Sequence, residues 1–334
     1  MNASLILEWV IKSVVLMLAL TVGFAYVTLY ERKVLARMQV RIGPNRAGPA
    51  GLLQPIADAL KLIFKEGFIP DKADKVVYVL APLITVIPAL IITAVVPWGP
   101  PVTIGGKTFT LSIADVNTGV LYLLTVTSIS VYGITLAGWS SNNKYSMLGG
   151  LRSTAQMISY ELALSMAYLG PVLIAGSLSM TTIINSQQHL WNIFYQPVAA
   201  IIFMIASIAE VNRSPFDMPE AEQELTAGYL TEYASMKFAM FYMAEYIKMI
   251  AVSMIGASLF LGGYWGPGVQ TYPWLGPIYL FIKVLILLFG FIWVRATLPR
   301  IRYDRLMAFG WKILFPIGLL NALVTAGVIL LVGG

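Results

Sequence analysis

Five ionisable side chains lie inside long apolar stretches of the sequence: Glu161, Glu210, Glu245, Lys248 and Lys283. A charged side chain facing lipid at mid-membrane costs at least about 2.5 kcal/mol, so such residues normally face a protein interior and mark proton or ion paths. Glu245 and Lys248 are three residues apart, so they can pair on one helix face and reduce that cost. Structural pairing remains the alternative for any one of them, but five in four stretches favour a proton or ion path.

A second cluster of carboxylates follows Ser214. Its members are Asp217, Glu220, Glu222, Glu224 and Glu232, with no Lys or Arg between Ser214 and Met236. Ionised carboxylates this close repel one another, so some can hold protons near neutral pH if burial adds to the repulsion. A solvated acidic loop, or a docking face for a basic partner, explains the cluster equally well. Glu210, which continues the acids into an apolar stretch, favours proton uptake.

A third feature is the segment ERKVLARMQVRIGPNRAGPAG followed by LLQPIADALKLIFKEGF. Apolar residues recur at helical spacing, with polar residues on the other side, which predicts an interfacial amphipathic helix over about 50–66. The Gly43-Pro44 and Gly48-Pro49 steps predict an extended, turn-rich approach to it. A membrane-surface anchor is the simplest interpretation. Beside the acidic loop and the basic last loop, the helix can also roof a cavity open to lipid, as an amphiphile site needs.

The composition requires a membrane to hold these features. Of 334 residues, 58% are hydrophobic and 11% are charged, and the mean hydropathy is +0.78, against roughly a quarter charged in soluble domains. Runs long enough to cross a ~30 Å hydrocarbon core lie at about 5–30, 76–97, 118–139, 154–176, 196–212, 238–262, 277–296 and 313–332. We therefore predict one all-α membrane domain over 1–334 with about eight transmembrane helices.

The basic residues predict the orientation of this domain. All but four of the Lys and Arg residues lie in or beside the odd-numbered loops, counted from the N-terminus. By the positive-inside rule, these loops are cytoplasmic and both termini lie on the outer face. The net charge of +6 therefore reflects membrane orientation and not nucleic-acid binding.

In the first outer loop, the alternation of apolar and polar residues from Pro101 to Ile113 predicts a small β-hairpin with Gly105-Gly106 at its turn.

Several classes of chemistry are unsupported by the sequence. The chain has no cysteine and one histidine, His189, which argues against disulfides, thiolate-bound zinc, iron–sulfur clusters and haem in this chain. It has no phosphate loop, no G-x-G-x-x-G, no H-E-x-x-H and no nucleophile elbow. We therefore expect no metal, cofactor or complete catalytic site in this chain, and any redox centre must lie in a partner.

Five strings resemble one family closely: ERKVLARMQVRIGPNRAGPAGLLQPIADALKLIFKE, GLRSTAQMISYE, EVNRSPFDMPEAEQELTAGYLTEY, FYMAEYIKM and WVRATLPRIRYDRLMAFGWK. This family is the quinone-site membrane subunit of proton-pumping NADH:quinone oxidoreductase, respiratory complex I, called the H subunit in bacteria and subunit 1 in organelles. The strings cover every odd-numbered loop and parts of most spans in the family's order. The resemblance implies eight transmembrane helices, an amphipathic helix after the first, and most of the membrane part of a quinone tunnel.

The resemblance also implies two sets of functional residues. The quinone tunnel would contain Glu31, Arg32, Arg41, Arg46, Asp58, Arg213, Phe216, Asp217, Tyr242, Arg295 and Arg300, with Arg302 and Asp304 in the same last loop. Coupling of quinone reduction to proton translocation would involve Glu161, Glu210, Glu220, Glu222, Glu224 and Glu245.

The implied cofactors and partners follow from the same family. Quinone would be the substrate, with ubiquinone and menaquinone both open, while NADH, FMN and iron–sulfur clusters would belong to partner subunits. The partners would be the quinone-site and terminal iron–sulfur subunits of the peripheral arm, small membrane subunits and antiporter-like subunits, in the inner or plasma membrane of a prokaryote. A stand-alone secondary cation/proton transporter is the alternative, since buried charges suit it too. The absence of paired repeats argues against it.

Overall fold

The computed structural model describes residues 3–104, 107–217 and 227–332. Within these ranges, seven helices are long and apolar enough to cross a membrane, which confirms the predicted all-α membrane class. They are α1 (Ala3–Met38), α3 (Lys75–Ile91, extended by the 3-10 turn η2, Ile92–Val95), α4 (Gly119–Ser140), α5 (Lys144–Ala175), α10 (Ser235–Phe260), α11 (Leu275–Thr297) and a last helix made of α12 (Tyr303–Phe309), the π-helical turn η4 (Gly310–Leu314) and α13 (Phe315–Val332).

The predicted span at 196–212 forms a shorter helix, α8 (Pro197–Glu210). Its 14 residues extend about 21 Å, less than the ~30 Å hydrocarbon core. N–H groups in the first turn of a helix have no partner within the helix, and proline has no N–H, so proline is common there. This explains why α8 begins at Pro197. Asn212 has a positive φ of 55°, which a right-handed helix cannot accommodate. Two short helices, α6 (Met180–Ser186) and α7 (Asn192–Tyr195), precede α8.

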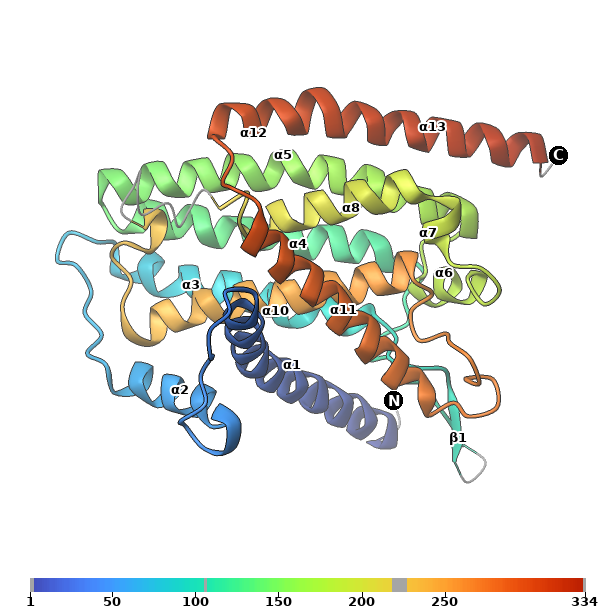
Figure 1. Cartoon of the computed structure of the whole chain (residues 1–334), viewed down its shortest axis with the longest axis horizontal. Coiled ribbons are helices and arrows are strands. Elements are labelled where there is room, and N and C mark those ends of the chain that lie inside the picture. Colours follow the sequence, from blue (N-terminus) through green and yellow to red (C-terminus); the bar gives the residue numbers. More distant parts are fainter. Residues whose placement is uncertain (1–2, 105–106, 218–226, 333–334) are drawn as a thin grey trace.

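Helices α1, α3 and α11 pack against α10, which is the most buried of the candidate spans. Figure 1 shows α3, α4, α5, α8 and α10 running in roughly one direction, with α1 and α11 crossing them obliquely and α13 along one edge.

Glycine lets two of these helices, α3 and α4, approach closely. A Cβ added at Gly133 in α4 would lie 2.1 Å from Oγ1 of Thr85 in α3 and 2.9 Å from the Ala81 carbonyl oxygen, so only glycine fits this contact without a shift.

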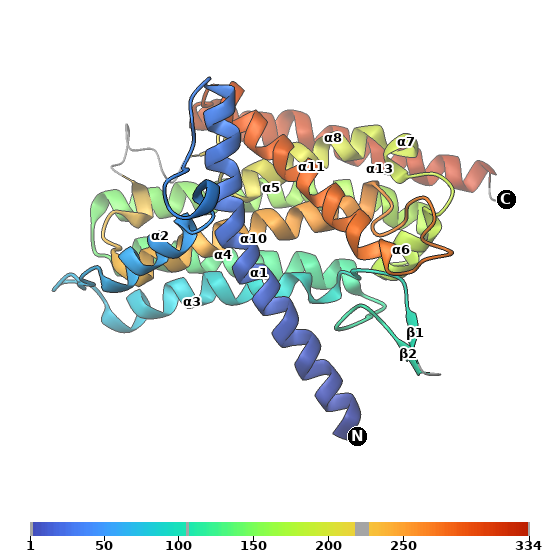
Figure 2. The same cartoon turned by 60° about the horizontal axis from the view of Figure 1, so that its bottom comes forward.

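The two ends of the bundle carry different structures. β1 (Val102–Ile104) and β2 (Lys107–Phe109) pair antiparallel, with Val102 opposite Phe109, which confirms the predicted hairpin, although its Gly105-Gly106 turn lies outside the described residues. Both termini lie at the hairpin's end of the bundle, and α2 (Gln54–Phe64) lies at the opposite end (Figure 2). The amphipathic segment is thus helical over 54–64, preceded by the 3-10 turn η1 (Pro49–Gly51).

Candidate functional site

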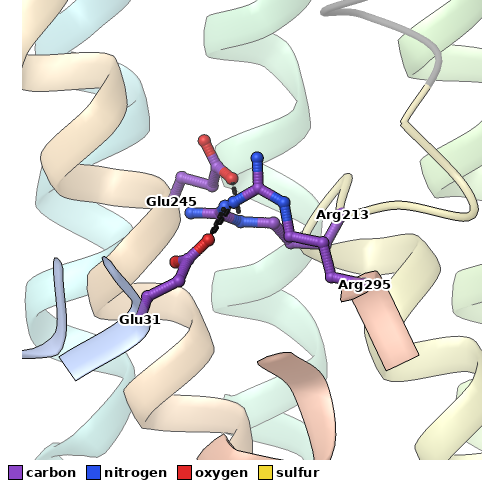
Figure 3. A network of polar contacts seen from close by, with 4 residues as sticks. All are labelled: Glu31, Arg213, Glu245 and Arg295. Atoms are coloured by element: carbon purple, nitrogen blue, oxygen red, sulfur yellow. Dashed lines mark hydrogen bonds and ion pairs between the residues drawn. The ribbon is translucent and has the colours of Figure 1, made fainter. Parts of the chain in front are cut away.

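Four charged side chains from four parts of the chain meet in one network (Figure 3). Nη1 of Arg213 lies 3.2 Å from Oε1 of Glu31, and Nη1 of Arg295 pairs with the same oxygen. Arg213 also forms an ion pair with Glu245. Glu31 and Arg213 are only 4% and 5% exposed. Two carboxylates and two guanidinium groups therefore neutralise one another where little water reaches them. Buried charges are tolerated only when they are paired in this way.

Local structure places each member of this network. Glu31 lies in the last third of α1, Glu245 in the middle of α10 and Arg295 in the last turn of α11. Arg213 follows α8 in a turn held by hydrogen bonds from its own N–H to the Ile208 carbonyl and from the Phe216 N–H to the Arg213 carbonyl. The turn points Arg213 into the space between α1, α10 and α11, as Figure 3 shows.

Arg213 is held in its charged form. Burial alone would lower the pKa of its guanidinium, but Glu245, Tyr246 and Glu31 raise it well above the ordinary value. The Tyr246 ring also lies beneath the guanidinium, with 4.3 Å from Arg213 Cζ to the ring centroid, a favourable cation–π distance. Arg213 is therefore a fixed positive charge, and changes in network charge must come from the carboxylates or from a ligand.

A cavity of about 430 Å³ lies between α1, α2 and the first half of α10. Most of its lining is apolar, including Phe24, Leu62 and Met243. Arg32 and Asp58 also line it, and they form an ion pair with 2.6 Å between Nη1 and Oδ2. This volume is within the range of small-molecule sites, which are mostly apolar with a few polar groups. We call it the α1–α2–α10 cavity.

Three aromatic rings of α10 connect this cavity to the charged network. Phe238 and Tyr242 line the cavity, and their ring centroids lie 5.8 Å apart. Tyr242 and Tyr246 follow at 5.2 Å, and Tyr246 carries Arg213 on its face. Residues four apart on a helix lie on one face, so the spacing Phe238, Tyr242, Tyr246 builds a continuous aromatic ladder. Sequence reasoning missed Tyr246 and Phe238, although this spacing could have revealed them.

A second, smaller cavity of about 20 Å³ lies among buried charges. Glu210, Glu245 and Lys248 line it, and the volume is enough for about one water molecule. Both carboxylate oxygens of Glu210 are buried without a hydrogen-bond partner among the described residues, and Lys248 interacts electrostatically with Glu161, Glu210 and Glu245. Glu161 also accepts a hydrogen bond from the Ser128 hydroxyl. The structure thus groups the predicted proton-coupling acids that it describes around one lysine.

The structure brings some of the predicted tunnel residues together. Glu31, Arg213 and Arg295 join the charged network, and Arg32, Asp58 and Tyr242 line the α1–α2–α10 cavity. Glu245, predicted for proton coupling and able by its spacing to pair with Lys248, interacts electrostatically with Lys248 and also forms an ion pair with Arg213, so it links the two predicted sets.

The other predicted residues lie elsewhere. Arg41 is exposed and donates to the Gln39 side chain, while Arg46 is also exposed. Phe216 lines a different, apolar groove. Arg302 pairs with Asp304 at 3.1 Å on the surface. Asp217 and Arg300 are half-buried. Glu220, Glu222 and Glu224 lie outside the described residues.

Two charges have structural partners. Nζ of Lys283 donates to the backbone carbonyls of Leu261, Gly263 and Trp265 at 2.6–2.8 Å, so all three ammonium protons are used. Glu232 accepts a hydrogen bond from the Asn143 amide at 2.6 Å. Among the described residues, no group of three or more His, Asp and Glu side chains could hold a metal ion.

Comparison with known proteins agrees with this architecture. The profile of the NADH dehydrogenase family matches residues 11–326. The chain is 53% identical to the H subunit of NADH-quinone oxidoreductase from Protochlamydia amoebophila, over 90% of this chain and 91% of that protein. It is 51% identical to the second H subunit from Geobacter metallireducens (95% and 94%) and 50% identical to subunit 8 from Thermus thermophilus (96% and 87%). The chain therefore belongs to the NADH dehydrogenase family, that of the H subunit of NADH-quinone oxidoreductase.

Proposed function

We propose that the α1–α2–α10 cavity is the membrane entrance of a quinone tunnel and that the charged network beyond it responds to quinone reduction. The observation that carries this proposal is the aromatic ladder, which joins an apolar cavity to a buried network of two carboxylates and two arginines. An amphiphile with a long apolar tail and a polar ring fits this arrangement, with the tail in the apolar cavity and the ring toward the charged network.

Coupling follows from the chemistry of the substrate. Reduction of a quinone to a quinol takes up two electrons and two protons and brings negative charge into a poorly solvated place. Arg213 and Arg295 would be drawn toward that charge, which would weaken their hold on Glu31 and Glu245. Glu245 also lines the small cavity with Glu210 and Lys248, so a change at Glu245 would alter proton affinity there. Glu210 and Glu161 would then relay the change sideways.

The chain would act as one subunit of a larger oxidoreductase, as the names of its relatives indicate. Electrons would come from NADH through FMN and iron–sulfur clusters in partner subunits, and peripheral-arm subunits would complete the quinone site. The odd-numbered loops, including the segment with α2, would face the cytoplasm of a prokaryotic cell, and both termini would face outward.

Filling the cavity tests the tunnel directly. Ala59 and Ala57 are both exposed on α2, but only Ala59 lines the cavity. In the intact complex, we expect Ala59→Phe to lower the rate of NADH-driven reduction several-fold for a long-tailed quinone and less for a short-tailed one, while Ala57→Phe changes neither. Unchanged long-tail kinetics in Ala59→Phe would remove the cavity from the quinone path. A chain that purifies alone and moves ions in liposomes without an electron donor would indicate a transporter.

A further inference from the structure

A second hollow runs along α8, apart from the α1–α2–α10 cavity. It encloses about 630 Å³ and is lined only by apolar residues from 193–208, 215–216, 294–301 and 309. No lining residue is shared with the α1–α2–α10 cavity. We call it the α8–α11 groove. It is separate from the cavity of the proposed quinone path, although its lining includes Phe216, which the family resemblance placed in the tunnel.

The geometry of two helices explains why this groove exists. Figure 1 shows that α11 crosses α8 obliquely and that the two diverge toward the end of the bundle that holds the termini. Ile201 and Leu298 line the groove and are 60% and 50% exposed, so the groove opens sideways from the protein. Its lining extends from Ile193, before α8, to Ile301, beyond α11, and therefore follows the whole ~21 Å length of α8.

The lining of the groove limits what can fill it, because none of its lining side chains is polar. A flexible hydrocarbon chain suits a long, narrow and wholly apolar hollow of this kind, because its surface needs no hydrogen bonds.

One end of the groove is basic. Leu298 and Ile301 line it, Arg302 is the next residue, and Arg305 lies in the first turn of α12; both arginines are exposed. Arg302 is 80% exposed and has Asp304 as its ion-pair partner, and Asp304 is the only acid from Leu298 to Lys312. Cations at the end of a membrane helix lie at the depth of lipid phosphates, where each attracts an anionic surface by about 1 kcal/mol.

We infer that the α8–α11 groove binds one anionic phospholipid, with an acyl chain along α8 and the phosphate beside Arg302 and Arg305. The apolar lining matches the acyl chain of such a lipid, and the cations at the end of the groove match its phosphate. A quinone tail would fill the groove but has no anionic group for the arginines, so the charge favours the phospholipid.

The test measures lipid retained by the intact complex. The complex is reconstituted with dioleoylphosphatidylglycerol in an excess of phosphatidylcholine and washed in mild detergent, and the retained lipids are counted by native mass spectrometry. Ile201 and Val198 are both exposed on α8, but only Ile201 lines the groove. We expect Ile201→Trp to retain one phosphatidylglycerol fewer than the wild type, and Val198→Trp to retain the same number.

A second variant tests the charge independently of groove shape. Arg302→Gln with Arg305→Gln should also lose one phosphatidylglycerol, whereas Lys72→Gln with Lys144→Gln, which removes two exposed cations elsewhere, should not. Equal phosphatidylglycerol in all variants would overturn the inference. So would the loss of bound quinone or of a partner subunit from Ile201→Trp in place of phosphatidylglycerol, since either would identify a different occupant.

Discussion

At the scale of single residues, the buried carboxylate of Glu31 is shared by two arginines. One of its oxygens serves both Arg213 and Arg295, which come from elements far apart in the sequence. The four-residue network is neutral only while both carboxylates are ionised. Removing one charge therefore leaves an uncompensated buried cation, and breaking a buried pair in this way typically costs about 3–5 kcal/mol.

Glu31→Gln should therefore impair the complex strongly. We expect quinone reductase activity to fall by at least about tenfold, which corresponds to 1.4 kcal/mol, because Arg213 and Arg295 lose a shared partner. Glu8→Gln is the matched control on α1, since Glu8 pairs with Lys12 at 2.6 Å near the first turns of the helix and takes no part in the network. Similar activity in both variants would contradict the role given to Glu31.

Two buried lysines should behave differently when mutated. Lys283 donates three hydrogen bonds to backbone carbonyls just beyond the end of α10, whereas Lys248 lies among the acids around the small cavity. We expect Lys283→Met to lower the thermal stability of the complex, through unsatisfied carbonyls, and to leave the ratio of protons pumped to NADH oxidised unchanged. Lys248→Met should lower that ratio. Measuring proton uptake and NADH oxidation together in vesicles distinguishes them, and a changed ratio in Lys283→Met would make it part of the relay.

At the scale of elements, the contact between α3 and α4 depends on one missing side chain. Gly133→Ala would place a methyl group against the Thr85 hydroxyl and the backbone of α3, and overpacking of this kind costs about 1–3 kcal/mol. Gly327 in α13 has nothing within 4 Å of an added Cβ, so Gly327→Ala should be neutral or slightly stabilising. Thermal denaturation of the two variants in detergent tests this difference. Equal melting temperatures would show that the α3–α4 contact is looser than the structure indicates.

Element lengths were harder to predict from the sequence than element types. The hairpin at 102–109 and the amphipathic helix within 50–66 followed from alternation and helical spacing alone. The apolar run over 196–212 did not reveal that its helix stops at Glu210. The stop depends on the conformation of Asn212, and hydrophobicity carries no information about a backbone turn.

At the scale of the whole molecule, composition determined the membrane class, but the meeting of charges required the fold. Arg213 and Arg295 lie 182 and 264 positions from Glu31, and no local pattern connects them. Spacing predicted that Glu245 and Lys248 could interact, and they do, but only packing brings Arg213 into an ion pair with Glu245. Long-range packing therefore decides which of several possible partners a buried charge receives.

The predicted orientation can be tested because the chain contains no cysteine. Gln188 and Asp71 are exposed and lie in an even-numbered and an odd-numbered loop. With the positive-inside orientation, a membrane-impermeant thiol reagent should label this chain in intact cells when it carries Gln188→Cys. Asp71→Cys should be labelled only after the membrane is opened. The reverse pattern would invert the proposed topology.

The short length of α8 also has an electrical consequence. With its first turn at one boundary of a ~30 Å hydrocarbon core, the last residue, Glu210, lies about 9 Å inside the other boundary. That depth is about a third of the core, and moving one charge across 100 mV requires about 2.3 kcal/mol. Each 100 mV of membrane potential would therefore change the work of bringing a proton to Glu210 from its nearer surface by about 0.7 kcal/mol, so the occupancy of this carboxylate would depend on voltage.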